Sequence, residues 1–144
     1  MYRFLEKHVA DYMSAPVVSV PPDTRLLELE QRFAEHDFNS FPVLDGGVLV
    51  GVVTKFDILK VFAFTPRSVV PRYAVLSQMR AAQMMTRDVI TFTPDTPLAR
   101  VLQTLVDFRV KSFPVVEGRH VVGIIAREDL VQALHDTCSP DISA

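Results

Sequence analysis

The sequence is poor in cysteine and has no long uncharged hydrophobic segment. Its single cysteine, Cys138, cannot form a disulfide within the chain, and the opening residues MYRFLEKHVA carry charges where a secretory signal would be apolar. The longest nearly uncharged stretches, such as 46–54 and 113–116, are far shorter than the roughly 20 residues that cross a bilayer. We therefore expect a cytoplasmic protein with no membrane partner.

An excess of charge of either sign is also missing. The 15 Lys and Arg residues nearly balance the 17 Asp and Glu residues, so the net charge is −2 and no general basic field is available to hold nucleic acid. An anionic ligand would need a few local cations instead. The 49% hydrophobic content and the length of 144 residues suit one compact domain, or two small units that share a core.

Motifs that indicate catalysis or metal binding are missing as well. The four histidines have no spacing that suggests a shared metal, such as i and i+4 on one helix. Cys138 lies in a TCSP segment without a neighbouring base, which argues against a catalytic thiol. We find no Gly-rich phosphate loop and no Ser-His-Asp arrangement. The sequence therefore predicts no catalytic residues, no metal site and no enzyme.

What the chain does contain is an internal repeat. Sliding the sequence against itself by 72 residues pairs 13–59 with 85–131 without a gap, and 15 of these 47 pairs are identical. A unit of this size buries too little surface to stand alone, so we expect the two copies to pack against each other. The predicted division is a first repeat with a leading helix at 1–64, a linker at 65–72, a second repeat with a leading helix at 73–136 and a tail at 137–144.

Each copy predicts the same order of elements: strand, helix, strand, strand, helix. A short β-branched run opens each copy, at 17–20 and 89–92, and a proline and Asp-Thr follow soon after it. Thr24 and Thr96 are the predicted N-caps of the next helix, because a hydroxyl there accepts from free amides of the first turn. Pro97 fits the first helical position of the second copy.

Apolar residues recur at helical spacing after these caps. They form a stripe that we expect to face the core: Leu26, Leu29 and Phe33 in the first copy, and Leu98, Val101, Leu102 and Leu105 in the second. A hairpin is predicted next in each copy, since glycines follow the FPV runs and accept the positive φ of a tight turn. The predicted strands are 41–44 with 48–54, and 113–116 with 120–126. Extra helices are expected at 2–12 and about 73–83.

Together these motifs carry a family resemblance. Two copies of M-[ST]-x(2)-V-[VI]-[ST], x-P-D-T, x-S-F-P-V and G-h-h-x-x-x-D, in register at one offset, resemble a tandem pair of cystathionine-β-synthase-type (CBS) domains, the arrangement called a Bateman module. The resemblance covers roughly residues 8 to 136. It implies an α/β (α+β) fold of two β-α-β-β-α repeats packed face to face with pseudo-twofold symmetry. It also implies a regulatory ligand containing adenosine (AMP, ADP, ATP or S-adenosylmethionine) in clefts between the copies.

Asp57 and Asp129 are the central candidate site residues. Each follows a strand at the start of a helix, where a carboxylate can accept both hydroxyls of a ribose or can simply cap the helix. Thr54 lies three residues before Asp57, where a hydroxyl and the free amides of a first turn attract a phosphate. Its counterpart in the second copy is Ala126, so we expect the cleft at Thr54 and Asp57 to bind a nucleotide better.

The resemblance adds residues that would reach the ligand from the opposite copy. Lys111 and Ser112 would serve the nucleotide held at Asp57, while Asn39 and Ser40 would face the one held at Asp129, beside Arg127. A lysine contributes a charge that asparagine cannot. Around the base, an apolar slot with a polar edge is expected from Val18, Ser19, Phe38 and Phe41, although such residues are more often plain core.

Two functions stay open at this point. The first is a stand-alone regulatory module that binds an adenosyl ligand and changes its shape or its affinity for a partner. The alternative is a dimerisation or interaction scaffold with empty clefts. The apolar segments 61–64 and 69–70 would be unusual surface on a monomer, so a homodimer is expected in either case.

Overall fold

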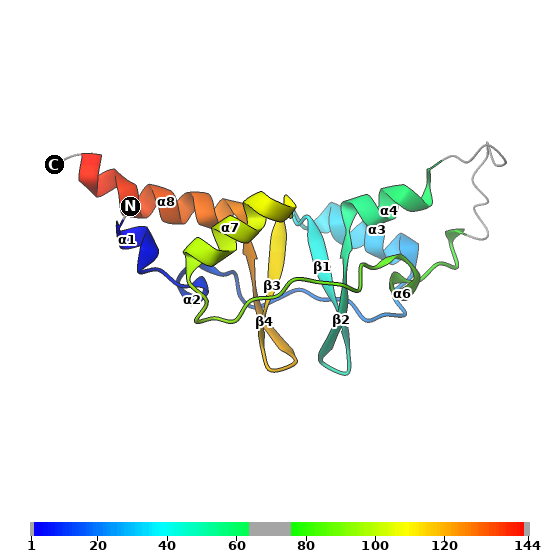
Figure 1. Ribbon diagram of the computed structural model, residues 1–144. Coiled ribbons are helices and arrows are strands. Elements are labelled where there is room, and N and C mark those ends of the chain that lie inside the picture. The colour runs from blue at the N-terminus through cyan, green and yellow to red at the C-terminus, as the bar shows by residue number, and fades with distance from the viewer. Residues whose placement is uncertain (1, 64–75, 143–144) are drawn as a thin grey trace. The chain divides into compact units, whose positions relative to one another are not determined.

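The computed structural model describes residues 2–63 and 76–142, and the chain divides into two compact units (Figure 1). The central unit is made of residues 18–89. The terminal unit combines 1–17 with 90–144 and so contains both ends of the chain. The linker predicted at 65–72, which includes the apolar residues Val69 and Val70, lies outside the described residues, as does Phe64. Each unit mixes helices with an antiparallel hairpin, as predicted.

In the central unit, helices flank one hairpin. Its elements are α3 (Leu26–Glu35), β1 (Ser40–Asp45), β2 (Val48–Thr54), α4 (Lys55–Val61) and α6 (Ala81–Met84). The hairpin pairs Ser40 with Thr54 at its open end and Asp45 with Val48 at the turn, where Gly46 and Gly47 have the positive φ that the sequence predicts. Because β2 runs directly into α4, residue 54 lies where the strand ends and the helix begins.

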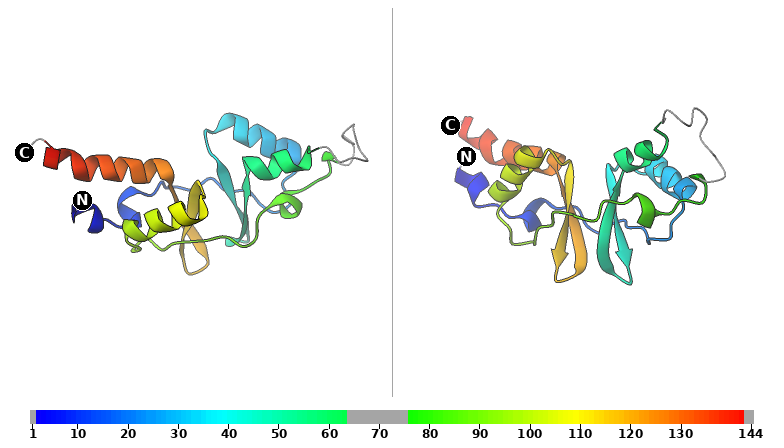
Figure 2. Two further views of the ribbon diagram at one scale, coloured as in Figure 1. Left: turned by 45° about the horizontal axis from the view of Figure 1, so that its top comes forward. Right: turned by 45° about the vertical axis from the view of Figure 1, so that its right-hand side comes forward.

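The terminal unit repeats this plan. Its elements are α1 (Tyr2–Leu5), α2 (Val9–Tyr12), α7 (Leu98–Phe108), β3 (Ser112–Glu117), β4 (His120–Ala126) and α8 (Arg127–Ile142). The β3–β4 pairing has the same register as β1–β2, from Ser112 opposite Ala126 to Glu117 opposite His120. Helix α8 lies against α1 and α7, as Figure 2 also shows. It continues to Ile142, through most of the segment predicted as a tail.

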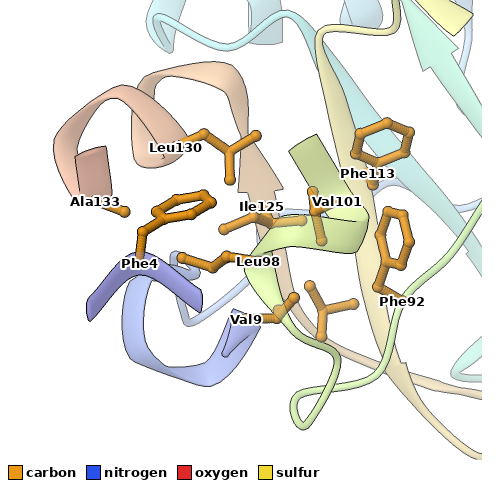
Figure 3. Packing of buried hydrophobic residues seen from close by; sticks show 10 residues of the cluster. Phe4, Val9, Phe92, Leu98, Val101, Phe113, Ile125, Leu130 and Ala133 are labelled. Carbon is orange, nitrogen blue, oxygen red and sulfur yellow. The ribbon is translucent and has the colours of Figure 1, made fainter. Parts of the chain in front are cut away.

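Each unit has its own hydrophobic core, and the predicted stripes face it. Leu26 and Leu29 are buried in the central core, with Phe33 packed against it. In the terminal unit, the stripe of α7 packs with both β strands, with α8 and with two residues from the start of the chain (Figure 3). The buried residues of this terminal core are Phe4, Val9, Phe92, Leu98, Val101, Phe113, Val115, Ile125, Leu130 and Ala133.

The predicted N-caps are wrong. The N-cap residues are Arg25 for α3 and Pro97 for α7, neither with a side-chain cap, so Pro97 precedes the first helical position. Thr24 instead donates its hydroxyl to the Pro21 carbonyl (2.8 Å), and Thr96 accepts from the Thr93 amide (3.1 Å). Both threonines stabilise the turn before the helix, a competing use of hydroxyls that short sequence patterns do not distinguish from capping.

The opening β-branched runs are shorter strands than predicted. Of 17–20 only Val20 is bridged, in parallel to Val43 of β1, and of 89–92 only Phe92, to Val115 of β3. Val20 donates to the Pro42 carbonyl and accepts from the Leu44 amide. Pro21 follows immediately and has no amide hydrogen, so it cannot continue this ladder as a donor.

The segments that lead into the repeats pack on the opposite repeat. Residues 9–14 bond to the second repeat, through Val9 to the Thr96 carbonyl and through Ser14 to Ile124 of β4. Residues 81–86 make the equivalent bonds to the first repeat, for example from Ala81 to the Thr24 carbonyl. The boundaries of the two compact units therefore differ from those of the sequence repeats at 1–64 and 73–136, because each leading segment belongs to the unit of the other repeat.

The leading segments are also less helical than predicted. The helix expected at 2–12 is two short helices, α1 and α2, and of the one expected at about 73–83 the described part contains only α6 as a full helix. Both segments instead form backbone hydrogen bonds to the turns before α3 and α7, which satisfies amides and carbonyls that a continuous helix would have bonded internally.

Candidate functional site

A capping box joins Thr54 and Asp57 at the start of α4. The Thr54 hydroxyl accepts from the Asp57 amide at 3.0 Å, and the Thr54 amide donates to Asp57 Oδ2 at 2.9 Å. The sequence motif T-x-x-D folds this way because the two side chains satisfy two amides of the first turn reciprocally. The structure therefore realises the helix-capping role that the sequence left open for Asp57, and it leaves further acceptor capacity on the carboxylate.

The Asp57 carboxylate is buried but has polar partners on its other oxygen. Asp57 is only 3% exposed, and its Oδ1 lies 3.4 Å from the Thr86 hydroxyl and 3.3 Å from Lys60 Nζ. A buried carboxylate needs such partners because desolvation of a charge is costly. The result is a carboxylate fixed at the junction of β2 and α4 by groups from three parts of the chain.

Thr86 reaches Asp57 because its segment lies unusually close to β2. The Thr86 amide and carbonyl both bond to Val52, at 2.8 and 2.9 Å. A Cβ added at Gly51 would lie 2.7 Å from Met85 Sδ and 2.8 Å from the Thr86 carbonyl oxygen, so only glycine permits this approach. The segment that leads into the second repeat thus supplies a hydroxyl to the carboxylate of the first.

The equivalent carboxylate of the terminal unit, Asp129, has different hydrogen-bond partners. Asp129 Oδ2 accepts from the Ala126 amide at 2.8 Å, but alanine has no hydroxyl to complete the box. The position equivalent to Lys60 is Gln132, which donates to Asp136 at 2.8 Å. Burial raises the pKa of the Asp129 carboxyl above its usual value, and the neighbouring Glu128 charge adds to the rise. Asp129 is therefore less stable as an anion than an ordinary aspartate.

The first turns of α4 and α8 offer fewer free amides than the sequence suggests. The Lys55 amide bonds to the Asn39 carbonyl at 3.2 Å, and the Arg127 amide bonds to the Lys111 carbonyl at 3.0 Å. In α4 the Asp57 amide is used by Thr54 as well. A phosphate at Thr54 would therefore rely on the hydroxyl proton of Thr54 and on nearby cations more than on the amides of the first turn.

The residues predicted to come from opposite copies are distributed over both units. Thr54, Asp57, Asn39 and Ser40 belong to the central unit, and the remaining predicted residues Lys111, Ser112, Arg127 and Asp129 belong to the terminal unit. The two serines begin β1 and β3. Lys111 and Arg127 are exposed, which leaves both side chains accessible to an anionic ligand.

The residues predicted to surround a base divide into core and surface. Phe41 is completely buried, and Val18 packs against the same core. Ser19 is half-buried. Phe38 is 41% exposed and stacks on His36, with ring centroids 5.1 Å apart and an angle of 4° between the planes. Phe38 is thus the accessible aromatic face in this set.

Two residues of this site were missed by the sequence interpretation. Lys60 follows Asp57 by three positions on a predicted helix, and i,i+3 pairing of opposite charges could have indicated it. Thr86 occupies a repeated motif position, M-[ST], but nothing local connects it to a carboxylate 29 residues earlier. Only the packing of 81–86 on the first repeat brings them together.

The described parts of the chain contain no group of three His, Cys, Asp or Glu side chains that could share a metal ion. Among the helices described, none is both long enough and apolar enough to cross a membrane. Cys138 is a half-buried free thiol on α8.

Comparison with known proteins agrees with the repeat. The CBS domain family matches residues 9–63 and 81–136. An A-adding tRNA nucleotidyltransferase of Geobacter sulfurreducens is 26% identical over 126 residues, which are 88% of this chain and 13% of that protein. An L-aspartate semialdehyde sulfurtransferase of Methanocaldococcus jannaschii is 30% identical over 124 residues, 85% of this chain and 22% of that protein. The chain thus spans less than a quarter of either relative.

Solved structures share the fold over nearly the whole chain. The CBS domain pair of protein MJ0100, in complex with 5′-methylthioadenosine and S-adenosyl-L-methionine, is 27% identical with a TM-score of 0.74, covering 91% of this chain and 98% of that one. CBSX2, in complex with AMP, is 22% identical with a TM-score of 0.78, covering 90% and 97%. With two matched copies that include both aspartate-bearing helix starts, the chain belongs to the CBS domain family.

Proposed function

We propose that this protein is a regulatory module without catalytic activity that binds an adenosine-containing ligand at Asp57. The observation that carries the proposal is the buried Asp57 carboxylate, fixed beside the Thr54 hydroxyl where β2 meets α4. A fixed carboxylate can accept the two neighbouring hydroxyls of a ribose, and a hydroxyl nearby can donate to a phosphate or another polar group. The 27% identical MJ0100 pair, whose ligands are adenosyl compounds, supports this class of ligand.

The rest of the proposed site comes from both repeats. Lys111 and Ser112 are proposed to contact the ligand at Asp57, with Val18, Ser19 and Phe38 near the base. Lys111 would favour a ligand that carries phosphate, such as AMP, ADP or ATP, whereas in S-adenosylmethionine it would have only the methionine carboxylate as an anionic partner.

A second, weaker site is proposed at Asp129, with Arg127, Asn39 and Ser40. Its support is the matching position at the end of β4 and the amide bond from Ala126. Two features argue for lower affinity: the missing hydroxyl at residue 126, and the raised pKa of Asp129, which makes the anionic acceptor form less favourable.

Ligand binding would regulate by favouring one arrangement of the two repeats. A ligand shifts such an equilibrium only through a difference in its affinity for the two states. Contacts from both repeats to one ligand would supply that difference.

Isothermal titration of the full chain with AMP, ADP, ATP, S-adenosylmethionine and adenosine tests the proposal. Asp57→Asn keeps an oxygen that can cap the helix but removes the charge and one acceptor, so it should abolish or strongly weaken binding at the tighter site. Asp37→Asn, at an exposed position of the same unit, is the control for the charge change. Unaltered affinity in Asp57→Asn would contradict the ribose assignment.

A homodimeric scaffold is the second candidate, and exposed apolar side chains favour it. Phe56 and Leu59 on α4 are 66% and 65% exposed, and Val131 on α8 is 65% exposed. Large exposed apolar residues on helices often mark an interface. Light scattering would give the mass in solution, and Leu59→Glu should lower it if α4 lies in a dimer interface. A dimer that gives no saturable heat with any of the adenosyl compounds would favour the scaffold.

A further inference from the structure

The acceptor capacity of Asp57 is largely used before any ligand arrives. An ionised carboxylate offers about four lone-pair sites, two on each oxygen. Among the described residues, Oδ2 accepts once, from the Thr54 amide. Oδ1 accepts from the Thr86 hydroxyl at 3.4 Å and forms an ion pair with Lys60, whose Nζ lies 3.3 Å away. One site thus remains on Oδ2, while Oδ1 has both a hydrogen-bond donor and a cation beside it.

A ribose needs one acceptor site on each oxygen, because its neighbouring 2′ and 3′ hydroxyls approach the two oxygens of a carboxylate together. Oδ2 has one acceptor site left for a hydroxyl. A hydroxyl that approaches Oδ1 must compete there with Thr86 and Lys60.

Lys60 is the partner that can leave. Thr86 is held through its backbone, which bonds to Val52 in both directions at 2.8 and 2.9 Å. The Lys60 side chain is flexible and 56% exposed, and half-exposed ion pairs contribute little to stability. Lys60 can therefore leave Oδ1 by rotation of a half-exposed side chain, while the backbone of Thr86 stays beside Asp57.

The ammonium also has a second favourable partner. Lys60 Nζ lies 5.5 Å from the centroid of the Phe56 ring, one turn earlier on α4. A cation at this distance from an aromatic face is attracted by the ring. When Lys60 leaves Oδ1 its ammonium can stay over the Phe56 ring, so the charge keeps a favourable contact.

We propose that Lys60 is a displaceable counter-ion of Asp57, which the ribose of the ligand replaces at Oδ1, and that Lys60 thereby lowers the affinity of the site for ribose. This rests on the proposed function, since it assumes that a ribose binds at Asp57. The second repeat has no such residue, because Gln132 and Glu128 stand where the first repeat has Lys60 and Phe56. Lys60 would thus reduce the difference in ribose affinity between the Asp57 site and the weaker site at Asp129.

The test compares Lys60→Met with the wild-type chain by isothermal titration. Methionine keeps an apolar side chain of similar length but removes the ammonium. Adenosine is the probe, because it has the ribose but no phosphate that Lys60 could attract. We expect Lys60→Met to bind adenosine about two- to fivefold more tightly, the factor that corresponds to a half-exposed ion pair. Lys55→Met, which makes the same charge change on the same helix, should bind adenosine as the wild type does.

A second ligand separates displacement from a general effect of charge. 2′,3′-Dideoxyadenosine lacks the 2′ and 3′ hydroxyls that would compete for Oδ1, so Lys60→Met and the wild type should bind it equally. Phe56→Leu should weaken adenosine binding while Lys60 is present and have a smaller effect in the Lys60→Met background, because the ring then has no cation to receive.

The outcomes are distinguishable. Adenosine binding by both proteins with equal or lower affinity in Lys60→Met would overturn the displacement and leave the proposed function in place. An equal gain for adenosine and for its dideoxy analogue would overturn it too, since the effect would not depend on the ribose hydroxyls. No saturable heat with adenosine, AMP, ADP, ATP or S-adenosylmethionine for either protein would overturn the proposed function and, with it, this inference. Binding of AMP without binding of adenosine would overturn this inference alone, since the ribose at Asp57 would then not carry the affinity.

Discussion

Phe4 offers a sharp test of how the two units are assembled. It is the fourth residue of the chain, ahead of the first repeat, yet it is 1% exposed in the core that contains Leu98, Ile125 and Leu130 of the second repeat. Phe4→Ala should therefore destabilise the terminal unit. Truncation of a fully buried Phe typically costs about 3–5 kcal/mol, a large part of the roughly 5–15 kcal/mol by which such proteins are stable.

The assay combines two measurements. Denaturant unfolding gives the loss in free energy, and hydrogen exchange followed by mass spectrometry locates it. We expect exchange to accelerate most in peptides from α7, β4 and α8, and less in peptides from α3, β1 and β2. Leu5→Ala is the matched control, because Leu5 is next to Phe4 on the same helix but is 54% exposed. Loss of the Leu5 side chain should change the free energy of unfolding by less than about 0.5 kcal/mol.

Two results would refute the reasoning. If Phe4→Ala were no more destabilising than Leu5→Ala, α1 would not be part of the core. If exchange accelerated chiefly in the central unit, the leading segment would pack on its own repeat after all.

The remaining predictions concern close packing, ionisation and capping. Gly51→Ala should destabilise by about 1–3 kcal/mol, measured by denaturant unfolding, because the added Cβ meets Met85 and the Thr86 backbone; wild-type stability in this variant would show that the segment moves freely. The folded-state pKa of Asp129 is raised, so its ionisation opposes folding above the ordinary carboxyl pKa of 3.8 and not below it. Asp129→Asn should consequently gain stability relative to the wild type as pH rises from about 4 towards 7, and a constant difference across that range would contradict the assignment. Ala126→Thr should complete the capping box of α8, stabilise by roughly 0.5–1 kcal/mol in thermal unfolding and strengthen ligand binding at Asp129, whereas unchanged stability would mean that the hydroxyl does not reach its amide.

The sequence predicted best where one local signal decides the structure. The hairpins follow from apolar runs interrupted by Gly46 and Gly118, both of which have the positive φ expected of them. The helix stripe of Leu98 and Val101 faces the core, since helical spacing puts both on one face. Neither feature depends on distant parts of the chain, and the repeat presented the same signals twice.

Prediction was less successful where one polar side chain has two possible hydrogen-bonding roles. The hydroxyl of Thr24 could cap a helix or close the preceding turn, and the turn prevails because the Pro21 carbonyl is within reach. For Asp57 the sequence left helix capping and ribose binding open. The structure confirms the capping role, which uses one acceptor site on Oδ2, and ribose binding stays a prediction.

By itself, then, the sequence determined the repeat, the order of its elements and the two aspartates at helix starts, because these depend on spacing along the chain. Only the tertiary structure decided which segments complete each core and which groups surround Asp57. The reason is physical: residues 9–14 and 81–86 form backbone hydrogen bonds to the repeat they do not belong to, and Val9, Ala81 and Met84 are buried in its core. No periodicity within a segment specifies that distant surface, and Thr86 meets Asp57 solely because of it.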